Sequence, residues 1–424
     1  MGPGDPPPSH RVTGSHPRFL TPRLRNNPPV RTLRRLMRGR DAVLVGFLVA
    51  ATLARAADPP LQALAREHVG PGQGVFVDTD DGTILIAEAA DGPVHPASVT
   101  KVATSLALLE RLGPTHRFAT RFDATGALAG GRIDGDVIVQ GGGDPFLVYE
   151  SAFLVLQRLR AIGVREVRGA IRVDGPLLFN WQPDPAAARL TRALAGRDGA
   201  VAWSAVGGEG PLARAGIVFD GGRRAARAAI HTLVTHRSAP LLHVLKACNG
   251  YSNNVLHYAS DVIGGPHVVQ TLAREAVPIA LRDEITIDNG AGAGTTNRLS
   301  PKAAVAILRA LDHHTRSIGH VITDVLPVSG IDPGTLHERL LDHPRYIVGK
   351  TGTFGSVGAS ALVGLLRSPR YGTVAFAVLN HGIAVPEARA RQDAFVRALA
   401  DAVAAEPWPY EAPARPAYRE AIIE

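Results

Sequence analysis

Short stretches of apolar or alternating residues lie near both ends of the chain and predict β-strands. Residues 75–78 and 83–87 have this character on either side of the turn Asp80-Asp81-Gly82, which predicts a β-hairpin. Three later stretches predict further strands at 346–349, 359–366 and 373–379. Strands from the two ends of the chain can therefore join in one antiparallel sheet.

Longer segments with helical character separate the hairpin from the later strands. The stretch VTKVATSLALLERLG follows Pro96-Ala97-Ser98 and stops at Gly113-Pro114, which is a typical end of a helix. Further helices are predicted at 241–247, 253–263, 268–276, 301–311 and 387–404. Because helices would cover the faces of an antiparallel sheet, the predicted fold class is α+β.

Residues 115–236 have a different pattern, in which short strand-like pieces alternate with Gly-rich turns such as 141–145 (GGGDP). One helix is predicted at 149–162, and strands are predicted at 117–122, 136–139, 170–173 and 216–219. This change of pattern predicts a smaller β-rich domain, inserted into a larger domain made of residues 58–114 and 237–424.

Composition and charge exclude several classes of protein. The 424 residues are 45% hydrophobic and 20% charged, which is typical of a globular chain with room for a large and a smaller domain. The net charge is +8, but residues 1–57 hold ten of the 46 basic residues and two of the 38 acidic ones. The remaining 36 basic and 36 acidic residues balance. A neutral body lacks the electrostatic footprint of a nucleic-acid-binding protein.

The basic N-terminal segment has the layout of an export signal. A run of 12 apolar residues at 42–53 is followed by Ala54-Arg55-Ala56, and it is preceded by Arg34, Arg35, Arg38 and Arg40. A spanning helix needs about 20 residues, so this run is too short to cross a bilayer. We therefore predict a leader at 1–57 with a signal peptide at 37–56, and a periplasmic or otherwise exported protein. A buried helix of the mature fold is the alternative.

Lysine is rare in this chain. It occurs only at 101, 246, 302 and 350, beside 42 arginines. Arginine cannot lose its proton in a protein, whereas lysine can when it is desolvated or close to another cation. A position that must act as a base therefore has to remain lysine, which makes each of the four a candidate.

Lys101 follows Ser98 by three residues at the predicted start of a helix. At this spacing the two side chains lie on one helix face, and the helix N-terminus can stabilise an oxyanion and lower the pKa of the amine. The pair is therefore a candidate nucleophile and base. The alternative is a helix-capping serine followed by a solvated lysine.

Two further motifs carry polar groups suited to peptide recognition. Lys350-Thr351-Gly352-Thr353 follows an apolar strand and offers an ammonium, hydroxyls and an unobstructed backbone to an anionic peptide end. Ser252 and Asn254 are two residues apart and can both face a cleft. Taken singly, the first also fits a β-turn and the second an ordinary helix cap.

The three motifs, in this order, form the signature of the penicillin-recognising serine enzymes. Between residues 72 and 400 the chain resembles the class C (type-4) low-molecular-mass penicillin-binding proteins, which are D-alanyl-D-alanine carboxypeptidases and endopeptidases. The resemblance also includes GGGDP, YSNN, IDNGAGAGTTNRLSP and LPVSGIDPGTLHERL at 326–340. It implies a β-lactamase/transpeptidase-like domain, with an antiparallel sheet flanked by helices, and a smaller inserted domain.

The resemblance also implies roles for the motif residues. Ser98 would attack a D-Ala-terminal bond or cross-link in a peptidoglycan stem peptide, and Lys101 would take its proton. Ser252 and Asn254 would move protons and hold the substrate backbone. The backbone N–H groups of Ser98 and Thr353 would form the oxyanion hole, and water would hydrolyse the acyl-enzyme.

On the same basis, Lys350, Thr351, Gly352 and Thr353 would bind the terminal carboxylate, and β-lactam antibiotics would be covalent inhibitors. No metal or cofactor is implied, since no histidine has metal-ligand spacing with carboxylates or cysteine. Cys248 lies in an apolar pattern and is predicted to be an inert buried thiol.

Two departures from the family pattern affect the expectations. Only 151 positions separate Lys101 from Ser252, which predicts one inserted domain rather than two nested ones. Residues 288–297 lack the serine of the usual Asp-Gly-Ser-Gly form.

Asp144 in the GGGDP turn is interpreted as a turn residue.

Two other functions compete with a peptidase. A β-lactamase or esterase would need a deacylating Glu, which the sequence does not reveal. A scaffold protein with a dead site would not need an intact Ser98, Lys101 and Lys350. The sequence leaves open the balance of carboxypeptidase and endopeptidase activity, the preferred third stem residue, the oligomeric state, a start at Met1 or Met37, and whether an uncleaved leader gives peripheral membrane association.

Overall fold

The computed structural model describes residues 61–222 and 230–424, so the predicted leader lies outside the described residues. Its central sheet has five antiparallel strands in the order β15-β16-β17-β1-β2. The strands are β1 (Gly74–Asp78), β2 (Ile84–Glu88), β15 (Val348–Phe354), β16 (Ala359–Ser368) and β17 (Gly372–Asn380). Pairing of β1 with β17 joins the two ends of the chain, as the sequence predicted.

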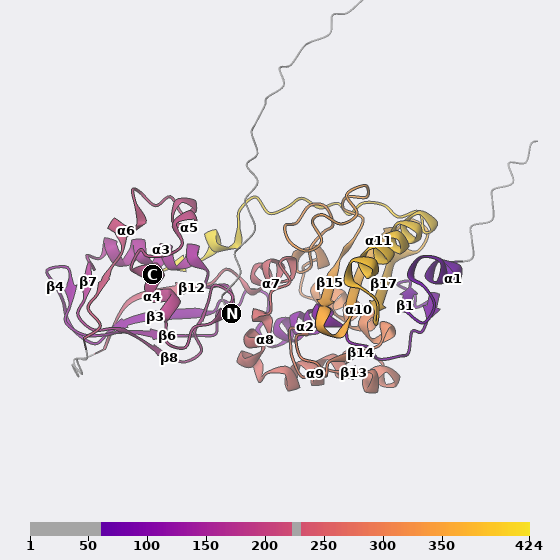
Figure 1. The fold of residues 1–424 in the computed structure, drawn as a ribbon, viewed down its shortest axis with the longest axis horizontal. Helices are drawn as coiled ribbons and strands as arrows, with labels where there is room; N and C mark the ends of the chain where they lie inside the picture. The colour runs from indigo at the N-terminus through magenta and orange to yellow at the C-terminus, as the bar shows by residue number, and fades with distance from the viewer. Residues whose placement is uncertain (1–60, 223–229) are drawn as a thin grey trace, which may run out of the picture. The chain divides into compact units, whose positions relative to one another are not determined.

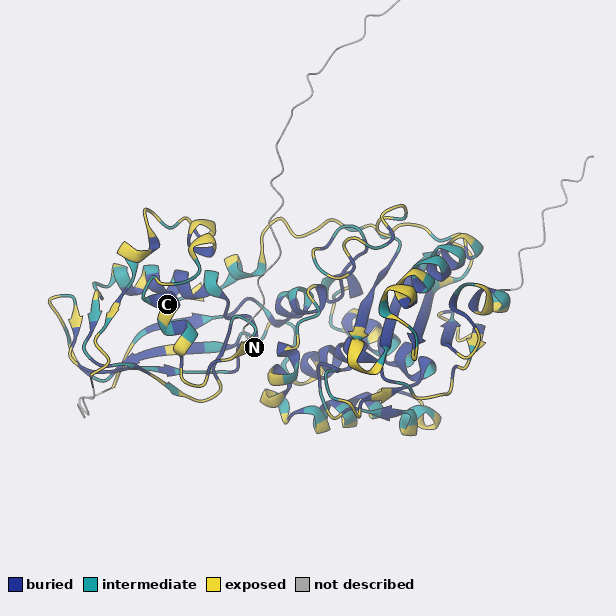
Figure 2. Cartoon of the chain, viewed as in Figure 1, coloured by how far each residue is buried: buried dark blue, intermediate teal, exposed yellow. Residues whose placement is uncertain are grey.

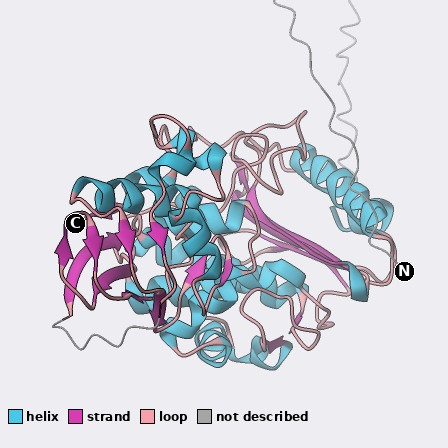
Figure 3. Ribbon diagram, turned by 60° about the vertical axis from the view of Figure 1, so that its left-hand side comes forward, coloured by secondary structure: helices cyan, strands magenta, loops and turns pink. Residues whose placement is uncertain are grey.

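Both faces of this sheet are buried. Successive side chains of a strand point to opposite faces, so neighbouring residues of one strand pack against different layers. In β16, Leu362 and Leu366 pack with α11 (Val385–Ala402) and with the N-terminal turns α1 (Leu61–Leu64) and η1 (Ala65–Val69). Val363 and Leu365 belong instead to the cluster that contains α2 (Lys101–Leu112) and α10 (Pro301–Ser317). The sheet therefore lies between helical layers (Figure 3), which confirms the α+β class.

Helix α2 is the centre of the larger helical layer. Its first nine residues, Lys101 to Leu109, are all buried. It contacts α10 and three further helices, α7 (Leu241–Gly250), α8 (Val255–Ser260) and α9 (Pro266–Glu275). The short pair β13 (Ile285–Thr286) and β14 (Arg298–Leu299) completes this layer. Because neighbours surround α2, its N-terminal turn has a fixed position.

Residues 119–237 build two small sheets around a separate group of buried side chains (Figures 1 and 2). The five-stranded sheet contains β3 (Ala119–Ala124), β6 (Val137–Gln140), β8 (Ile171–Asp174), β12 (His231–Arg237) and β18 (Ile422–Ile423). The four-stranded sheet contains β4 (Leu128–Ala129), β5 (Arg132–Ile133), β7 (Glu166–Val167) and β11 (Val218–Phe219). A two-stranded ribbon pairs β9 (Leu178–Phe179) with β10 (Gln182–Pro183).

The helices of this segment include one that the sequence predicted and three that it missed. The predicted helix is α3 (Tyr149–Ala161). The missed helices are short and follow one another as α4 (Ala188–Leu194), α5 (Ala200–Ala205) and α6 (Leu212–Ala215). Pieces of four to seven residues are too short to show a helical period.

The last 20 residues form an extended segment that returns from α11 to the sheet of β12 (Figure 1). Its strand β18 pairs with β12 through Ile422 and Ile423. Along the way the Tyr410 hydroxyl donates to Asp332 Oδ1 at 2.6 Å, and Arg117 Nη1 donates to the Glu420 carbonyl at 2.7 Å. The sequence patterns did not predict this strand.

None of the helices within residues 61–222 and 230–424 is long and apolar enough to cross a membrane.

Replacing Phe153 with Ala should lower the free energy of unfolding by about 3–5 kcal/mol, because it opens a cavity in a closed core. Phe153 is fully buried on α3 and packs edge-on against Trp203 with ring centroids 5.8 Å apart. Urea denaturation followed by circular dichroism measures the loss. Phe153→Leu keeps most of the volume and should cost clearly less; equal costs for the two variants would contradict the packing argument.

Candidate active site

Ser98 lies in a tight turn directly before α2. The turn is the 3-10 helix η2 (Ala97–Thr100), and Ala97 has a φ of 48°, in the left-handed region that non-glycine residues rarely adopt. The Ala97 N–H donates to His95 Nδ1 at 3.1 Å, and the Thr100 hydroxyl donates to the Ala97 carbonyl at 2.9 Å. Ser98 keeps 9% of its surface exposed. These bonds hold the nearly buried Ser98 in a fixed, strained turn.

Lys101 begins α2 and points back to this turn. Its Nζ lies 2.6 Å from Ser98 Oγ, 3.1 Å from Asn254 Oδ1 and 2.8 Å from the Ala291 carbonyl. The side chain is completely buried, and this desolvation lowers the pKa of the amine to about 7. Near neutral pH a neutral amine is therefore available to accept the proton of Ser98.

Lys350 and Ser252 form a second amine–hydroxyl pair beside the first. Lys350 Nζ donates to Ser252 Oγ and to the Thr351 carbonyl, both at 2.8 Å. Burial lowers the pKa of Lys350, and the nearby charge of Lys101 lowers it further. Ser252 has a φ of 56°, so its position also requires an uncommon backbone conformation. Two hydroxyls are thus each in contact with an amine of lowered basicity.

The edge strand β15 runs directly past the nucleophile turn. A Cβ atom on Gly352 would lie 2.7 Å from the Pro96 carbonyl oxygen and 3.1 Å from the Ser98 nitrogen, so a larger residue would push the strand away. Thr351 Oγ1 lies 2.6 Å from Thr335 Oγ1, and Thr353 is exposed. The structure thereby brings the eight residues predicted from the sequence into one site.

One contributor to the site has no side-chain signature. The loop 288–297 places the Ala291 carbonyl on Lys101, where the sequence had suggested only a missing serine. Gly292 has a φ of 73°, and a Cβ atom there would lie 1.8 Å from the Ala97 carbonyl oxygen. Asn297 Nδ2 ties the loop to Thr100 Oγ1 at 3.1 Å. Glycine at position 292 thus lets the loop come close to the nucleophile turn, where the Ala291 carbonyl accepts from Lys101.

The other two lysines have structural partners. Lys246 Nζ lies 2.5 Å from Asp332 Oδ2 and donates to the Leu326 carbonyl at 2.7 Å. Lys302 pairs with Asp91. Of the four lysines singled out by their rarity, two therefore belong to the site and two form ion pairs within the fold.

The structure supports the interpretation of Cys248 as an inert buried thiol and of Asp144 as a turn residue. Cys248 is fully buried, and burial raises the pKa of its thiol, as expected of an inert side chain. Asp144 Oδ1 accepts from the Phe146 N–H at 2.8 Å, which is the contact of a turn residue. Its other oxygen lies 3.5 Å from His236 Nδ1, and burial raises the pKa of this carboxyl to about 7.

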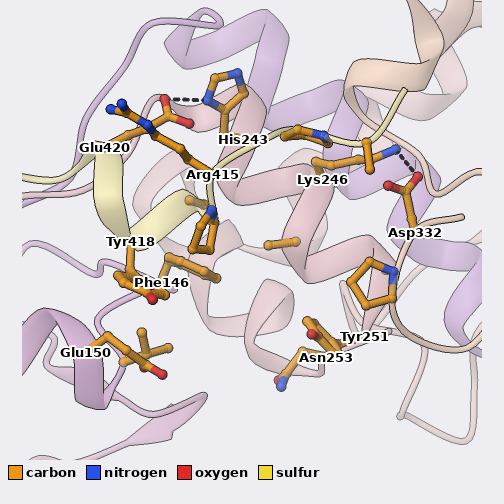
Figure 4. Close-up of a pocket in the computed structure, with 18 of the residues that line it drawn as sticks. Phe146, Glu150, His243, Lys246, Tyr251, Asn253, Asp332, Arg415, Tyr418 and Glu420 are labelled. Carbon is orange, nitrogen blue, oxygen red and sulfur yellow. Dashed lines mark hydrogen bonds and ion pairs between the residues drawn. The ribbon is translucent and has the colours of Figure 1, made fainter. Parts of the chain in front are cut away.

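A cavity of about 780 Å³ adjoins the site. Tyr251 and Asn253, the neighbours of Ser252, lie in its wall together with Phe146 (Figure 4). Trp181 also lines this cavity. The ring centroid of Trp181 lies 5.2 Å from that of Phe146 and 6.4 Å from that of Tyr251. An aromatic surface therefore extends from beside Ser252 into the cavity.

Comparison with known proteins shows the family of this chain. The sequence profile of the D-Ala-D-Ala carboxypeptidase 3 (S13) family matches residues 56–183 and 209–402. This chain belongs to the S13 family. The S13 chain is thus a serine-type D-Ala-D-Ala carboxypeptidase, and the resemblance proposed from its motifs is confirmed.

Relatives of this S13 carboxypeptidase are similar over most of their length. The carboxypeptidase DacB of Mycolicibacterium smegmatis is 26% identical over 80% of this chain and 82% of its own. The peptidoglycan endopeptidase Bd3459 of Bdellovibrio bacteriovorus, also solved in a penicillin G-acylated form, superposes with a TM-score of 0.67 at 19% identity over 83% of this chain and 98% of its own. Penicillin-binding protein 4 of Haemophilus influenzae gives 0.58 at 18% identity, over 81% and 99%. The two structures establish the transpeptidase-like fold.

The rate of D-Ala release by this S13 carboxypeptidase should rise with pH through about 7 and then level off. The reason is that only the neutral Lys101 amine can accept a proton, and its pKa is about 7. The pH dependence of kcat/KM on a D-Ala-D-Ala peptide measures this.

The matched control is Lys101→Arg, which keeps the charge but cannot lose a proton. It should reduce the rate on the plateau above pH 7 by about 10²–10⁴-fold and should abolish the rise of the rate across pH 7. A wild-type rate that did not change across pH 7 would contradict the role of Lys101 as base.

Proposed function

We propose that this chain hydrolyses D-Ala-terminal bonds and cross-links of peptidoglycan stem peptides through an acyl-enzyme on Ser98. The observation that carries the proposal is the 2.6 Å contact between Ser98 Oγ and the Nζ of a completely buried Lys101. A lysine in water would be protonated and useless as a base, whereas this amine has a pKa of about 7. Such an arrangement makes serine nucleophilic at neutral pH.

In the proposed reaction Lys101 takes the hydroxyl proton while Ser98 Oγ attacks the carbonyl carbon. The N–H groups of Ser98 and Thr353 stabilise the oxyanion, because β15 runs against the nucleophile turn. Asn254 holds the amine through its 3.1 Å bond and contacts the substrate backbone. The proton taken up by Lys101 passes through Ser252 to the leaving amine, so both residues return to their starting protonation states. Water then attacks the acyl-enzyme and restores the Ser98 hydroxyl.

Substrate recognition is assigned to both sides of the scissile bond. On the leaving side, Lys350, Thr351, Gly352 and Thr353 bind the carboxylate of the departing D-amino acid. On the other side, the 780 Å³ cavity accepts the preceding part of the stem peptide, since ligand pockets have volumes of about 300–1,000 Å³. Its aromatic wall suits the apolar parts of such a peptide.

β-Lactams are proposed to acylate the same serine. They present a strained amide with a nearby carboxylate, and the groups described above serve both features. The penicillin G-acylated form of Bd3459 supports this proposal. A scaffold with a dead site would have no use for a buried, partly deprotonated Lys101.

We also propose that residues 115–236 are an inserted domain within a catalytic domain of 58–114 and 237–424. In support, a closed group of buried side chains runs from Phe122 to Val234. The leader 1–57 would export the protein to the periplasm or beyond, where peptidoglycan lies. No metal or other cofactor enters the proposed reaction.

Labelled penicillin should form a stable covalent adduct with the purified protein and none with Ser98→Ala, because the adduct requires the hydroxyl. Gel fluorescence measures the adduct, and the parent protein should also release D-Ala from a stem pentapeptide. Circular dichroism of the variant provides the folding control.

Three outcomes separate the competing functions. A stable adduct that is lost in Ser98→Ala supports the peptidase. A folded parent protein without an adduct would contradict the mechanism and favour a dead-site scaffold. Label that appears and is quickly lost would favour a β-lactamase.

A further inference from the structure

The carboxylate next to the scissile bond requires a cation that the known motifs supply poorly. Lys350 is completely buried, and both burial and Lys101 lower its pKa. Its Nζ is already bonded to Ser252 Oγ and to the Thr351 carbonyl. Each time Lys350 is neutral, the leaving residue would face only hydroxyls and backbone N–H groups. A permanently charged group at this place would remove that weakness.

Arg389 on α11 provides such a group. Its Nη2 donates to Thr353 Oγ1 at 3.0 Å, at the mouth of the site. Within the described part of the chain, no carboxylate lies within ion-pair distance of this guanidinium, and its side chain is exposed. Arginine stays protonated at every physiological pH and can bind a carboxylate through two parallel N–H bonds.

The backbone that carries Arg389 is firmly anchored. Its helix neighbour Gln392 is fully buried and donates to Ser360 Oγ at 3.1 Å and to Asn380 Oδ1 at 2.9 Å. Arg339 donates to the Arg389 carbonyl at 3.3 Å and also bonds Asp393 on the same helix. The Cα of Arg389 is therefore fixed relative to the sheet, while its guanidinium remains free to accept an anion.

A second arginine of the same helix, two residues further on, shows what an ordinary surface arginine looks like here. Arg391 pairs with Glu387 Oε1 at 2.6 Å and donates to the Val69 carbonyl at 2.9 Å. It has a carboxylate as counter-charge, and each of its two terminal nitrogens has an acceptor. Arg389 differs because it donates to a hydroxyl of the KTGT motif. This contrast points to a ligand for Arg389 and gives a matched control.

We propose that Arg389 binds the carboxylate of the leaving D-amino acid together with Thr353, and that it thereby sets the preference for a free carboxylate beside the scissile bond. The proposal rests on the proposed function and extends it by one specificity residue. A D-Ala at a free chain end and a D-amino-acid centre in a cross-link both carry this carboxylate. Arg389 would therefore serve both kinds of substrate.

The test compares two peptides that differ only at the leaving residue. One ends in D-Ala-D-Ala with a free carboxylate, and the other ends in the corresponding carboxamide. Arg389→Ala should lose about 10–100-fold in kcat/KM on the acid, the loss expected for a hydrogen-bonded charge, with little change on the carboxamide. Arg389→Lys should fall between Arg389→Ala and wild type, and Arg391→Ala should keep the wild-type ratio of acid to carboxamide.

The possible failures are distinguishable. Wild-type activity with an unchanged acid-to-carboxamide ratio in Arg389→Ala would overturn the inference and leave the proposed function intact. An equal loss on both peptides would also overturn it, since that result indicates a structural role. Wild-type protein that releases no D-Ala from the acid would overturn the proposed function and this inference with it.

Discussion

The burial of two lysine amines in one site is the constraint on which the rest of this structure depends. Among the described residues, neither Lys101 nor Lys350 has a carboxylate within ion-pair distance. Their acceptors are hydroxyls, an amide oxygen and backbone carbonyls, which satisfy the N–H groups without supplying a counter-charge. Desolvation is therefore uncompensated and lowers the pKa of both amines, which makes Lys101 available as a base. A carboxylate close to the two amines would stabilise their charged forms, and a charged amine cannot accept a proton.

Sequence motifs predicted the side chains of the site well, for a local reason. Ser98 and Lys101 belong to one turn, so their contact follows from spacing. The Ala291 carbonyl could not be predicted, because every residue has a carbonyl and only the folded loop selects one. Arg389 was equally hidden, since it is one of 42 arginines and 36 positions separate it from Thr353. Residue type reveals a group only where that type is rare or its neighbours are diagnostic.

The same distinction applies to the fold. The later strands β16 and β17 follow from nearly continuous apolar runs, because both faces of the sheet are buried and few positions can be polar. Helices α4 to α6 and the two-residue strand β18 gain their stability from tertiary contacts and leave no period in the sequence. The sequence also missed the seven-residue strand β12, whereas it placed a strand over the two-residue β11, so length alone does not separate the predicted elements from the missed ones.

The returning C-terminal segment changes the mechanics of the molecule. The strands that enter and leave the region of residues 119–237, β3 and β12, are paired neighbours and so would act together as a single hinge axis. Strand β18 adds a third attachment, and the bond of Tyr410 to Asp332 pins the segment beside the cavity. This third attachment would restrain motion about the pair of β3 and β12. One wall of the cavity is thus a segment of chain held at both ends, by Tyr410 and by β18, and a single cut between these two attachments would separate them.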